Sequence, residues 1–305
     1  MSKLSDAVKA LINASHAAPG ITKASPQVQP ALKRFAEDAH TKQVGLPSWV
    51  TVSTAVSATM NCPEAMTSVF HLANEKSHTD NATPTQNAEL IREVGLKCIS
   101  FNGIPRSINC LNAFHGSLPE DVAKSLQERP PSRELTPRNV EARKAGGLAL
   151  WDSVYTGFER KLLDKLGRSH PDLPVHILNG HYSNLLSNPP RDEVLAEQYS
   201  KNNVTPVGRV LTSLVAISCL RAQTGVGPQV VSHIFGLRKA YEQGMRARRV
   251  RSRSGAASGW RPMRGTSGCW GTSTGLSRRS AARDRGRRLR LVLSLSYNRP
   301  LYLLT

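Results

Sequence analysis

The feature that most constrains the fold is a pair of apolar segments that meet at Gly225-Val226-Gly227-Pro228. On both sides of this point apolar residues recur at helical spacing (Val210, Leu211, Leu214, Val215 and Ile217 before it; Val230, Val231, Ile234, Phe235 and Tyr241 after it). Glycine permits the chain to reverse, and proline suits the first turn of a helix because its missing N–H costs nothing there. The pattern predicts a tight, buried hairpin of two helices.

An earlier part of the chain follows the same plan. Thr83-Pro84-Thr85-Gln86 is typical of a helix start, and the helix it begins ends at Asn102-Gly103-Ile104-Pro105, where another begins. Aligning Gly103-Ile104 with Gly225-Val226 gives a divergent internal repeat with an offset of about 122 residues.

The remaining segments favour an all-α fold. Residues 48–60 are rich in β-branched side chains that would also suit a strand, but they lead into a helix start at 61–64, and we expect helices in both. Two more helices are expected over 147–167 and 171–187, followed by a loop over 188–207. Gly244 stands where a helix C-terminal cap belongs.

These expectations define three parts of the chain. Residues 1–45 are an N-terminal helix with a loose connection, and 46–244 are the all-α domain. Its halves, about 46–125 and 141–244, are joined by a proline- and charge-rich linker over 126–140. Residues 245–305 are an Arg-rich tail that we expect to be disordered.

The formal net charge of +19 is concentrated in that tail. Residues 246–305 hold 15 arginines, no lysine and one acidic residue, Asp284, and so contribute +14, which leaves +5 for the first 245 residues. Arginine-rich stretches can bind nucleic-acid phosphates, with Trp260 and Trp270 available for stacking. The alternatives are a tail without a role and translated intron or shifted-frame sequence, which the absence of lysine favours. Residues 289–298 alternate apolar and polar residues and would suit an exposed strand.

Cysteine and histidine spacings point away from metal sites and cofactors. The five cysteines show no Cys-x-x-Cys pair, which is typical of a reduced, intracellular compartment. His176 and His181 are five residues apart and are expected on different helix faces, unlike the i, i+4 pairs of zinc sites. We therefore expect no metal and no cofactor. No apolar run approaches the length of a membrane span.

Together with the hairpins, the segments WDSVY (151–155), HPDLPVHIL (170–178) and SHIFGLRKA (232–240) carry a resemblance. Over residues 46–244 the chain resembles the alkylhydroperoxidase D-like / carboxymuconolactone decarboxylase-like superfamily, particularly its two-halved fungal branch. The resemblance implies an all-helical homo-oligomer located in mitochondria or peroxisomes, with the cytoplasm as the alternative.

The resemblance also identifies a candidate catalytic residue. The peroxidase branch uses a Cys-x-x-Cys pair followed by a histidine, and His233 matches that histidine, but the cysteine positions fall on Val226 and Gln229. In the first half they fall near Gly103 and Arg106, again without sulfur. Dithiol peroxidase chemistry there is therefore not expected, because it needs two thiols within disulfide reach. The decarboxylase branch uses a histidine as acid or base, a role open to His233 in lyase- or isomerase-type chemistry.

Each candidate has a structural alternative. His233 lies at the edge of an apolar stripe and suits a buried core or interface histidine. Cys110, at the comparable place in the first hairpin, is a weaker catalytic candidate and suits buried filler, as do Cys98 and Cys219. Cys62 stands at a helix start, where a thiol pKa can be lowered. Arg106 and Arg221, each beside a glycine turn, could neutralise an acidic ligand, and the alternative is a solvated or structural role. Trp151 and Tyr155 are expected to pack together in the core.

Three functions stay open. The first is a family member without the redox pair that binds or transforms a small organic molecule near His233. The second is a non-catalytic homo-oligomeric scaffold in which apolar neighbours seal the same histidine. The third is nucleic-acid binding through the arginine tail.

Overall fold

The described residues form an all-α protein. The computed structural model describes residues 4–75, 82–127, 131–188 and 207–258, the last of these from residue 244 onward as backbone alone. Within these ranges all regular secondary structure is helical, with no strand, which confirms the expected fold class. The tail beyond Ser258, including the alternating segment over 289–298, lies outside the described residues. Nucleic-acid binding by the tail therefore stays a prediction.

The N-terminal part runs α1 (Asp6–Ile12), η1 (Ser15–Ala17), α2 (Val28–Thr41), α3 (Leu46–Thr59) and α4 (Pro63–Ala73). Helix α3 is central and buried on most of its sides. Its β-branched residues do not prevent a helix, because the helix propensity they lose is small and burial against the neighbouring helices outweighs it. The hydroxyls of two threonines also bond back to the preceding turn. Thr51 donates to the Pro47 carbonyl at 2.6 Å and Thr59 to the Ala55 carbonyl at 2.7 Å.

Both expected hairpins are present. The first consists of α5 (Pro84–Lys97), α6 (Ile99–Asn102) and α7 (Ile104–Gly116), and α8 (Glu120–Gln127) follows it. Thr83 and Gln86 form a capping box that starts α5, and Gly103 makes the turn at φ +77°. The second consists of α13 (Arg209–Gln223) and α14 (Gly227–Ser258), with Gly225 at φ +71°. Both turns need the left-handed backbone that glycine adopts without strain.

The two hairpins share one core. Helix α3 packs against α5 of the first hairpin and α13 of the second, and α13 also contacts α6. The main cluster of buried apolar residues includes side chains from α3, α5 and α13. The repeat expected from the sequence therefore forms a single body around α3, in which the two hairpins contact each other.

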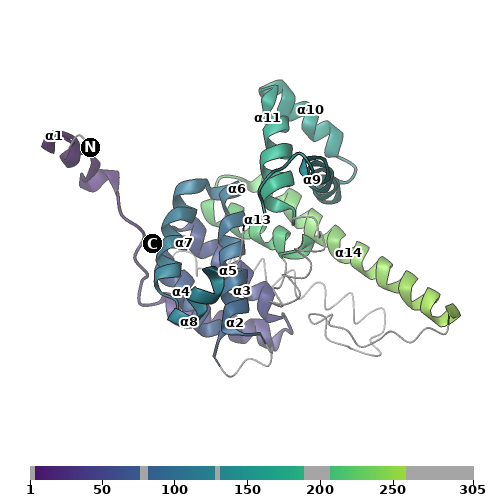
Figure 1. Cartoon of the computed structure of the whole chain (residues 1–305), viewed down its shortest axis with the longest axis horizontal. Coiled ribbons are helices and arrows are strands. Elements are labelled where there is room, and N and C mark those ends of the chain that lie inside the picture. The colour runs from purple at the N-terminus through teal and green to yellow at the C-terminus, as the bar shows by residue number, and fades with distance from the viewer. Residues whose placement is uncertain (1–3, 76–81, 128–130, 189–206, 259–305) are drawn as a thin grey trace.

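A third group of helices covers one end of that body: α9 (Val140–Tyr155), α10 (Glu159–Ser169), α11 (Asp172–His176) and the π-helix η2 (Ile177–Leu186). Figure 1 shows α9, α10 and α11 together above α13 and α14. The single helix expected over 147–167 is wrong, because the chain breaks after Tyr155 and Gly157 takes φ +89°. Trp151 and Tyr155 pack together as expected, with ring centroids 4.3 Å apart.

Helix α14 is longer than the sequence indicates. It continues through Gly244 to Ser258, so the helix end expected at Gly244 is wrong, and Figure 1 shows it extending away from the body. A glycine inside a helix costs only about 1 kcal/mol, and the arginines and alanines that follow favour helix. Among the described helices, none has the length and apolar character needed to cross a membrane.

Candidate functional site

His233 lies in α14 where that helix faces α9, and its side chain is buried, with 6% of the residue exposed. Its Nε2 atom is 3.5 Å from the hydroxyl of Tyr155. The imidazole also meets the rings of Phe101 and Tyr155 edge to face, with centroids 5.9 and 6.0 Å apart. The structure thus brings the residue singled out by the sequence together with an aromatic cluster.

Two tyrosines extend this cluster away from the imidazole. The hydroxyl of Tyr182, from η2, donates to the hydroxyl of Tyr155 at 3.2 Å. Trp151 packs edge to face on Tyr182, with centroids 5.0 Å apart. A chain of polar atoms therefore runs from Tyr182 through Tyr155 to His233 inside an apolar surrounding. The sequence pattern predicted that Tyr155 packs in the core but gave no sign of its contact with His233.

Arg209, the first residue of α13, brings a positive charge to the cluster. Its Nε donates to the Ser153 hydroxyl at 2.7 Å, and its Nη2 donates to the Gly236 carbonyl at 2.8 Å. A third bond goes from Nη1 to the Ser213 hydroxyl. All these acceptors are neutral, and among the described side chains none offers Arg209 a carboxylate within ion-pair distance.

Burial and this charge set the protonation of the cluster. Burial, followed by the charge of Arg209, lowers the pKa of His233 to about 4, so the imidazole is neutral at physiological pH. Burial raises the pKa of Tyr155 and of Tyr182, so both phenols keep their protons. The guanidinium of Arg209 is then the one full charge in this group of four side chains.

A small cavity lies beside the imidazole. Its volume is about 10 Å³, which is room for one water molecule. The Nδ1 atom of His233 is buried and has no hydrogen-bond partner among the described residues. The lining is mostly apolar: Phe101, Leu150, Val154, Tyr182, Leu186, Thr212, Ser213, Ala216 and His233. Ser213 connects this lining to Arg209.

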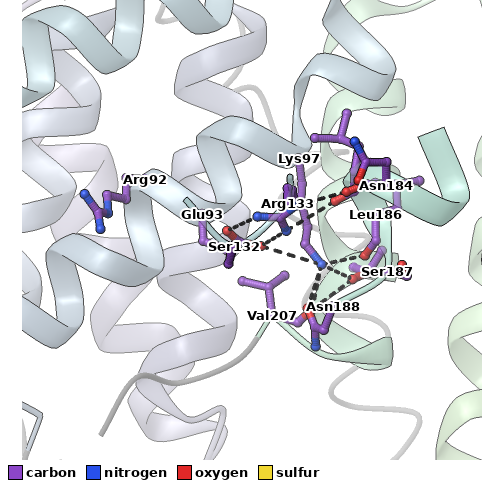
Figure 2. A network of polar contacts seen from close by, with 12 residues as sticks. Arg92, Glu93, Lys97, Ser132, Arg133, Asn184, Leu186, Ser187, Asn188 and Val207 are labelled. Atoms are coloured by element: carbon purple, nitrogen blue, oxygen red, sulfur yellow. Dashed lines mark hydrogen bonds and ion pairs between the residues drawn. The ribbon is translucent and has the colours of Figure 1, made fainter. Parts of the chain in front are cut away.

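A second buried polar network is centred on Lys97 and is shown in Figure 2. The amine of Lys97, in α5, has no exposed surface and donates to the carbonyls of Leu186 at 2.6 Å and Val207 at 2.9 Å. It also donates to Asn188 Oδ1 at 3.1 Å. Burial lowers the pKa of Lys97 to about 7, although the carboxylate of Glu93, 3.9 Å away, opposes this shift.

This network and the cavity share two residues. Leu186 and Thr212 line the cavity, and the amine of Lys97 binds the Leu186 carbonyl and lies 3.4 Å from the Thr212 hydroxyl. Neither Lys97 nor Arg209 was predicted from the sequence as part of a site. The available signal was that each basic residue stands in or directly beside a run of apolar helical positions, where a charge must find buried partners.

None of the described cysteines lines the cavity beside His233. Cys110 is buried in α7, its sulfur is 4.0 Å from the Ser57 carbonyl, and burial raises its pKa to about 12. It does not line the His233 cavity. The lowered pKa that a helix start can give a thiol is not found at Cys62, because burial raises its pKa. Arg106 has a structural contact, since Nη1 donates to the Thr59 carbonyl beside the first hairpin turn.

The histidine pair corrects another expectation. The rings of His176 and His181 lie 5.2 Å apart, on one face and not on different faces. The reason is that the chain passes from α11 into the wider turns of η2 between them, which brings residues five apart into register. Across the described ranges, no three His, Cys, Asp or Glu side chains form a group that could hold a metal ion.

In the described residues, the fold and the site define an all-α protein with two glycine-turn hairpins and one buried histidine among aromatic side chains. No family model matches the chain, and no solved structure matches it. It is similar to Peroxisomal protein 2 of Saccharomyces cerevisiae, with 27% identity over 183 residues. The alignment covers 54% of this chain and 59% of the yeast protein, so the chain spans less than two thirds of that relative.

Proposed function

We propose that this is a peroxisomal protein of the alkylhydroperoxidase D-like / carboxymuconolactone decarboxylase-like type that binds or transforms a small carboxylic acid beside His233. Two features of the site carry the proposal together. The Nδ1 atom of His233 is buried without a hydrogen-bond partner, and the nearby guanidinium of Arg209 has no carboxylate partner among the described residues. The two hairpins and the position of His233 support the family type.

The charge of the site favours an anionic ligand. A buried cation is stabilised by a negative partner, and Arg209 is bonded only to neutral oxygens of Ser153, Ser213 and Gly236. Ser213 lines the cavity, so a carboxylate there lies within the field of the guanidinium. The neutral imidazole of His233 carries one ring N–H, which can donate a hydrogen bond to the carboxylate.

The size of the site limits the ligand. A volume of about 10 Å³ admits a molecule little larger than water unless side chains move. Phe101 and Leu150 are the half-buried members of the lining, whereas its other residues are buried. Rotation of these two side chains is the entry route that we propose for a larger acid.

Binding of acetate, with acetamide as its neutral counterpart, tests the proposal. Isothermal titration should detect acetate, and not acetamide, with the wild type, and acetate binding should be lost in His233→Ala and Arg209→Gln. His115→Ala, at an exposed histidine of α7, is the matched control and should bind as the wild type does. Equal binding of acetate and acetamide, or acetate binding that survives both site variants, contradicts the proposal.

The peroxisomal location rests on the similarity to the yeast Peroxisomal protein 2. Fluorescence of the tagged chain coincident with a peroxisomal marker is the expected result. Signal in mitochondria or throughout the cytoplasm would contradict this part of the proposal without affecting the ligand site.

A non-catalytic homo-oligomeric scaffold is the second candidate, favoured by the closure of the cavity and by exposed apolar side chains. Val231 and Phe235 on α14 are 51% and 54% exposed, and Ile104 and Ile108 on α7 are 58% and 51% exposed. Each pair is one helical turn apart, as in a helix-packing interface. If sedimentation shows an oligomer that Phe235→Glu dissociates while acetate does not bind, the scaffold is the better account.

A further inference from the structure

Two cysteines at nearly corresponding positions of the hairpins touch each other in the core. Cys98 stands between α5 and α6, and Cys219 lies in α13, 121 residues later, close to the offset of the two glycine turns. Their sulfur atoms are 3.5 Å apart, and both thiols are free and fully buried. The internal repeat thus places one thiol from each half at the contact between the halves.

The surroundings of the two sulfurs are unequal. The Asn102 side-chain amide donates to Cys219 Sγ at 3.6 Å. Burial by itself raises the pKa of Cys219, but hydrogen bonds from Cys98, Thr59 and Asn102 outweigh burial and lower it. The pKa of Cys98 is raised, first by its bond to Cys219 and then by burial. Cys219 is therefore the better nucleophile of the pair, and Cys98 is the thiol that keeps its proton.

We propose that Cys98 and Cys219 form a redox-active dithiol, which a hydroperoxide oxidises to a disulfide that joins the two hairpins. The proposal rests on the contact of the two sulfurs and does not depend on ligand binding at His233. It concerns a different place from Val226 and Gln229, where the chain has no cysteine.

The reaction balances with the peroxide as the oxidant. The Cys219 thiolate attacks one peroxide oxygen, the O–O bond breaks, and the leaving oxygen takes a proton to give water from hydrogen peroxide or an alcohol from an organic hydroperoxide. The sulfenic acid formed on Cys219 is then attacked by the Cys98 sulfur. An S–S bond forms, the S–O bond breaks, and hydroxide leaves with the proton of Cys98 as a second water.

The distance between the two sulfurs allows a disulfide to form, and their burial limits the size of the oxidant that can reach them. The sulfurs must approach from 3.5 Å to the roughly 2.05 Å of a disulfide bond, a movement within the reach of side-chain rotation. Because both sulfurs are enclosed, we expect hydrogen peroxide to reach them through brief openings and bulky disulfide reagents to be excluded. Cys62 and Cys110 have raised pKa values and are expected to react more slowly.

Mass spectrometry of the full chain in a Cys269→Ser background tests the proposal. After hydrogen peroxide, the intact mass should fall by two hydrogens, and one cross-linked peptide pair should contain Cys98 and Cys219. In Cys98→Ala, dimedone should trap a sulfenic acid on Cys219, whereas in Cys219→Ala the Cys98 thiol should stay reduced. Cys110→Ala is the matched buried control and should form the cross-link as the parent protein does.

Two outcomes would overturn the proposal. If peroxide leaves Cys98 and Cys219 as free thiols in a protein with unchanged circular dichroism, or joins either of them to another cysteine instead, the proposal is overturned. His233→Ala should still form the cross-link, so failure of the ligand site and failure of the dithiol are distinguishable. Circular dichroism of both alanine variants establishes that loss of the cross-link is not loss of the fold.

Discussion

The amine of Lys97 lies 2.6 Å from the carbonyl oxygen of Leu186, and this bond connects residues 89 positions apart in the chain. Lys97 belongs to the first hairpin, and Leu186 ends the π-helix that lines the His233 cavity. The same amine binds the carbonyl of Val207, just before α13 begins. A single buried amine therefore connects three segments that lie far apart in the sequence.

Replacing Lys97 by methionine should destabilise the protein by about 2–4 kcal/mol, because the carbonyls of Leu186 and Val207 lose their buried donor while the aliphatic volume is kept. Chemical denaturation measures this difference. Lys124→Met, at an exposed lysine of α8, is the control and should change stability by less than about 0.5 kcal/mol. A Lys97→Met protein as stable as the wild type would show that the network contributes nothing to stability.

Lys97 should also make stability depend on pH. Its pKa is about 7 in the fold and near its ordinary value of 10.5 when unfolded, so between these values the unfolded chain binds more protons. This contribution is complete above pH 10.5 and is lost as the pH falls towards 7, by about 1.4 kcal/mol per pH unit. The difference between wild-type and Lys97→Met unfolding free energies, measured from pH 7 to 10, isolates it. A difference that does not vary with pH contradicts the lowered pKa.

Adjacent glycines of α9 should respond oppositely to alanine. A Cβ at Gly147 would lie 2.5 Å from the backbone nitrogen and Cα of Ser183, whereas at Gly146 its nearest neighbour is 4.0 Å away. Gly147→Ala should therefore force α9 and η2 apart and cost about 3 kcal/mol or more, while Gly146→Ala should stabilise by up to about 1 kcal/mol. Thermal unfolding compares the two, and equal melting temperatures would disprove the close packing.

The neutral state of His233 predicts an acid-sensitive fold. Its pKa is about 4 in the fold against about 6.5 when unfolded, so its contribution is complete above pH 6.5 and is lost as the pH falls to 4. The loss amounts to about 3 kcal/mol. The unfolding free energies of wild type and His233→Gln, plotted against pH over this range, should converge or cross as the pH falls. Parallel curves would mean that the imidazole titrates normally.

Much of the fold follows from local sequence patterns. The capping box at Thr83 and Gln86, and the glycine turns at Gly103 and Gly225, act over a few residues, and the structure has each of them where it was expected. The misplaced ends have local reasons too. Gly157 breaks a helix whose apolar periodicity continues across the break, and Gly244 is carried within α14 by the helix formers that follow.

Less of the site could be predicted from the sequence, because the site depends on contacts between segments far apart in the chain. His233 was identified by its place in the second hairpin, but its neighbours Tyr155 and Tyr182 come from helices 78 and 51 positions away. Lys97 and Arg209 read as ordinary helical residues until the fold shows what surrounds them. The contact between Cys98 and Cys219 required the repeat to be folded, since spacing alone indicates only two buried thiols.

The most direct test of the His233 site is nitrogen-15 NMR of the imidazole during titration with acetate. Comparison with His233→Ala assigns the resonances of this ring among those of the other histidines. We predict that acetate shifts the resonances of both ring nitrogens of His233, that acetamide does not, and that Arg209→Gln abolishes the shift. Resonances of His233 that stay unchanged at saturating acetate, in a protein whose fold is intact, would contradict it.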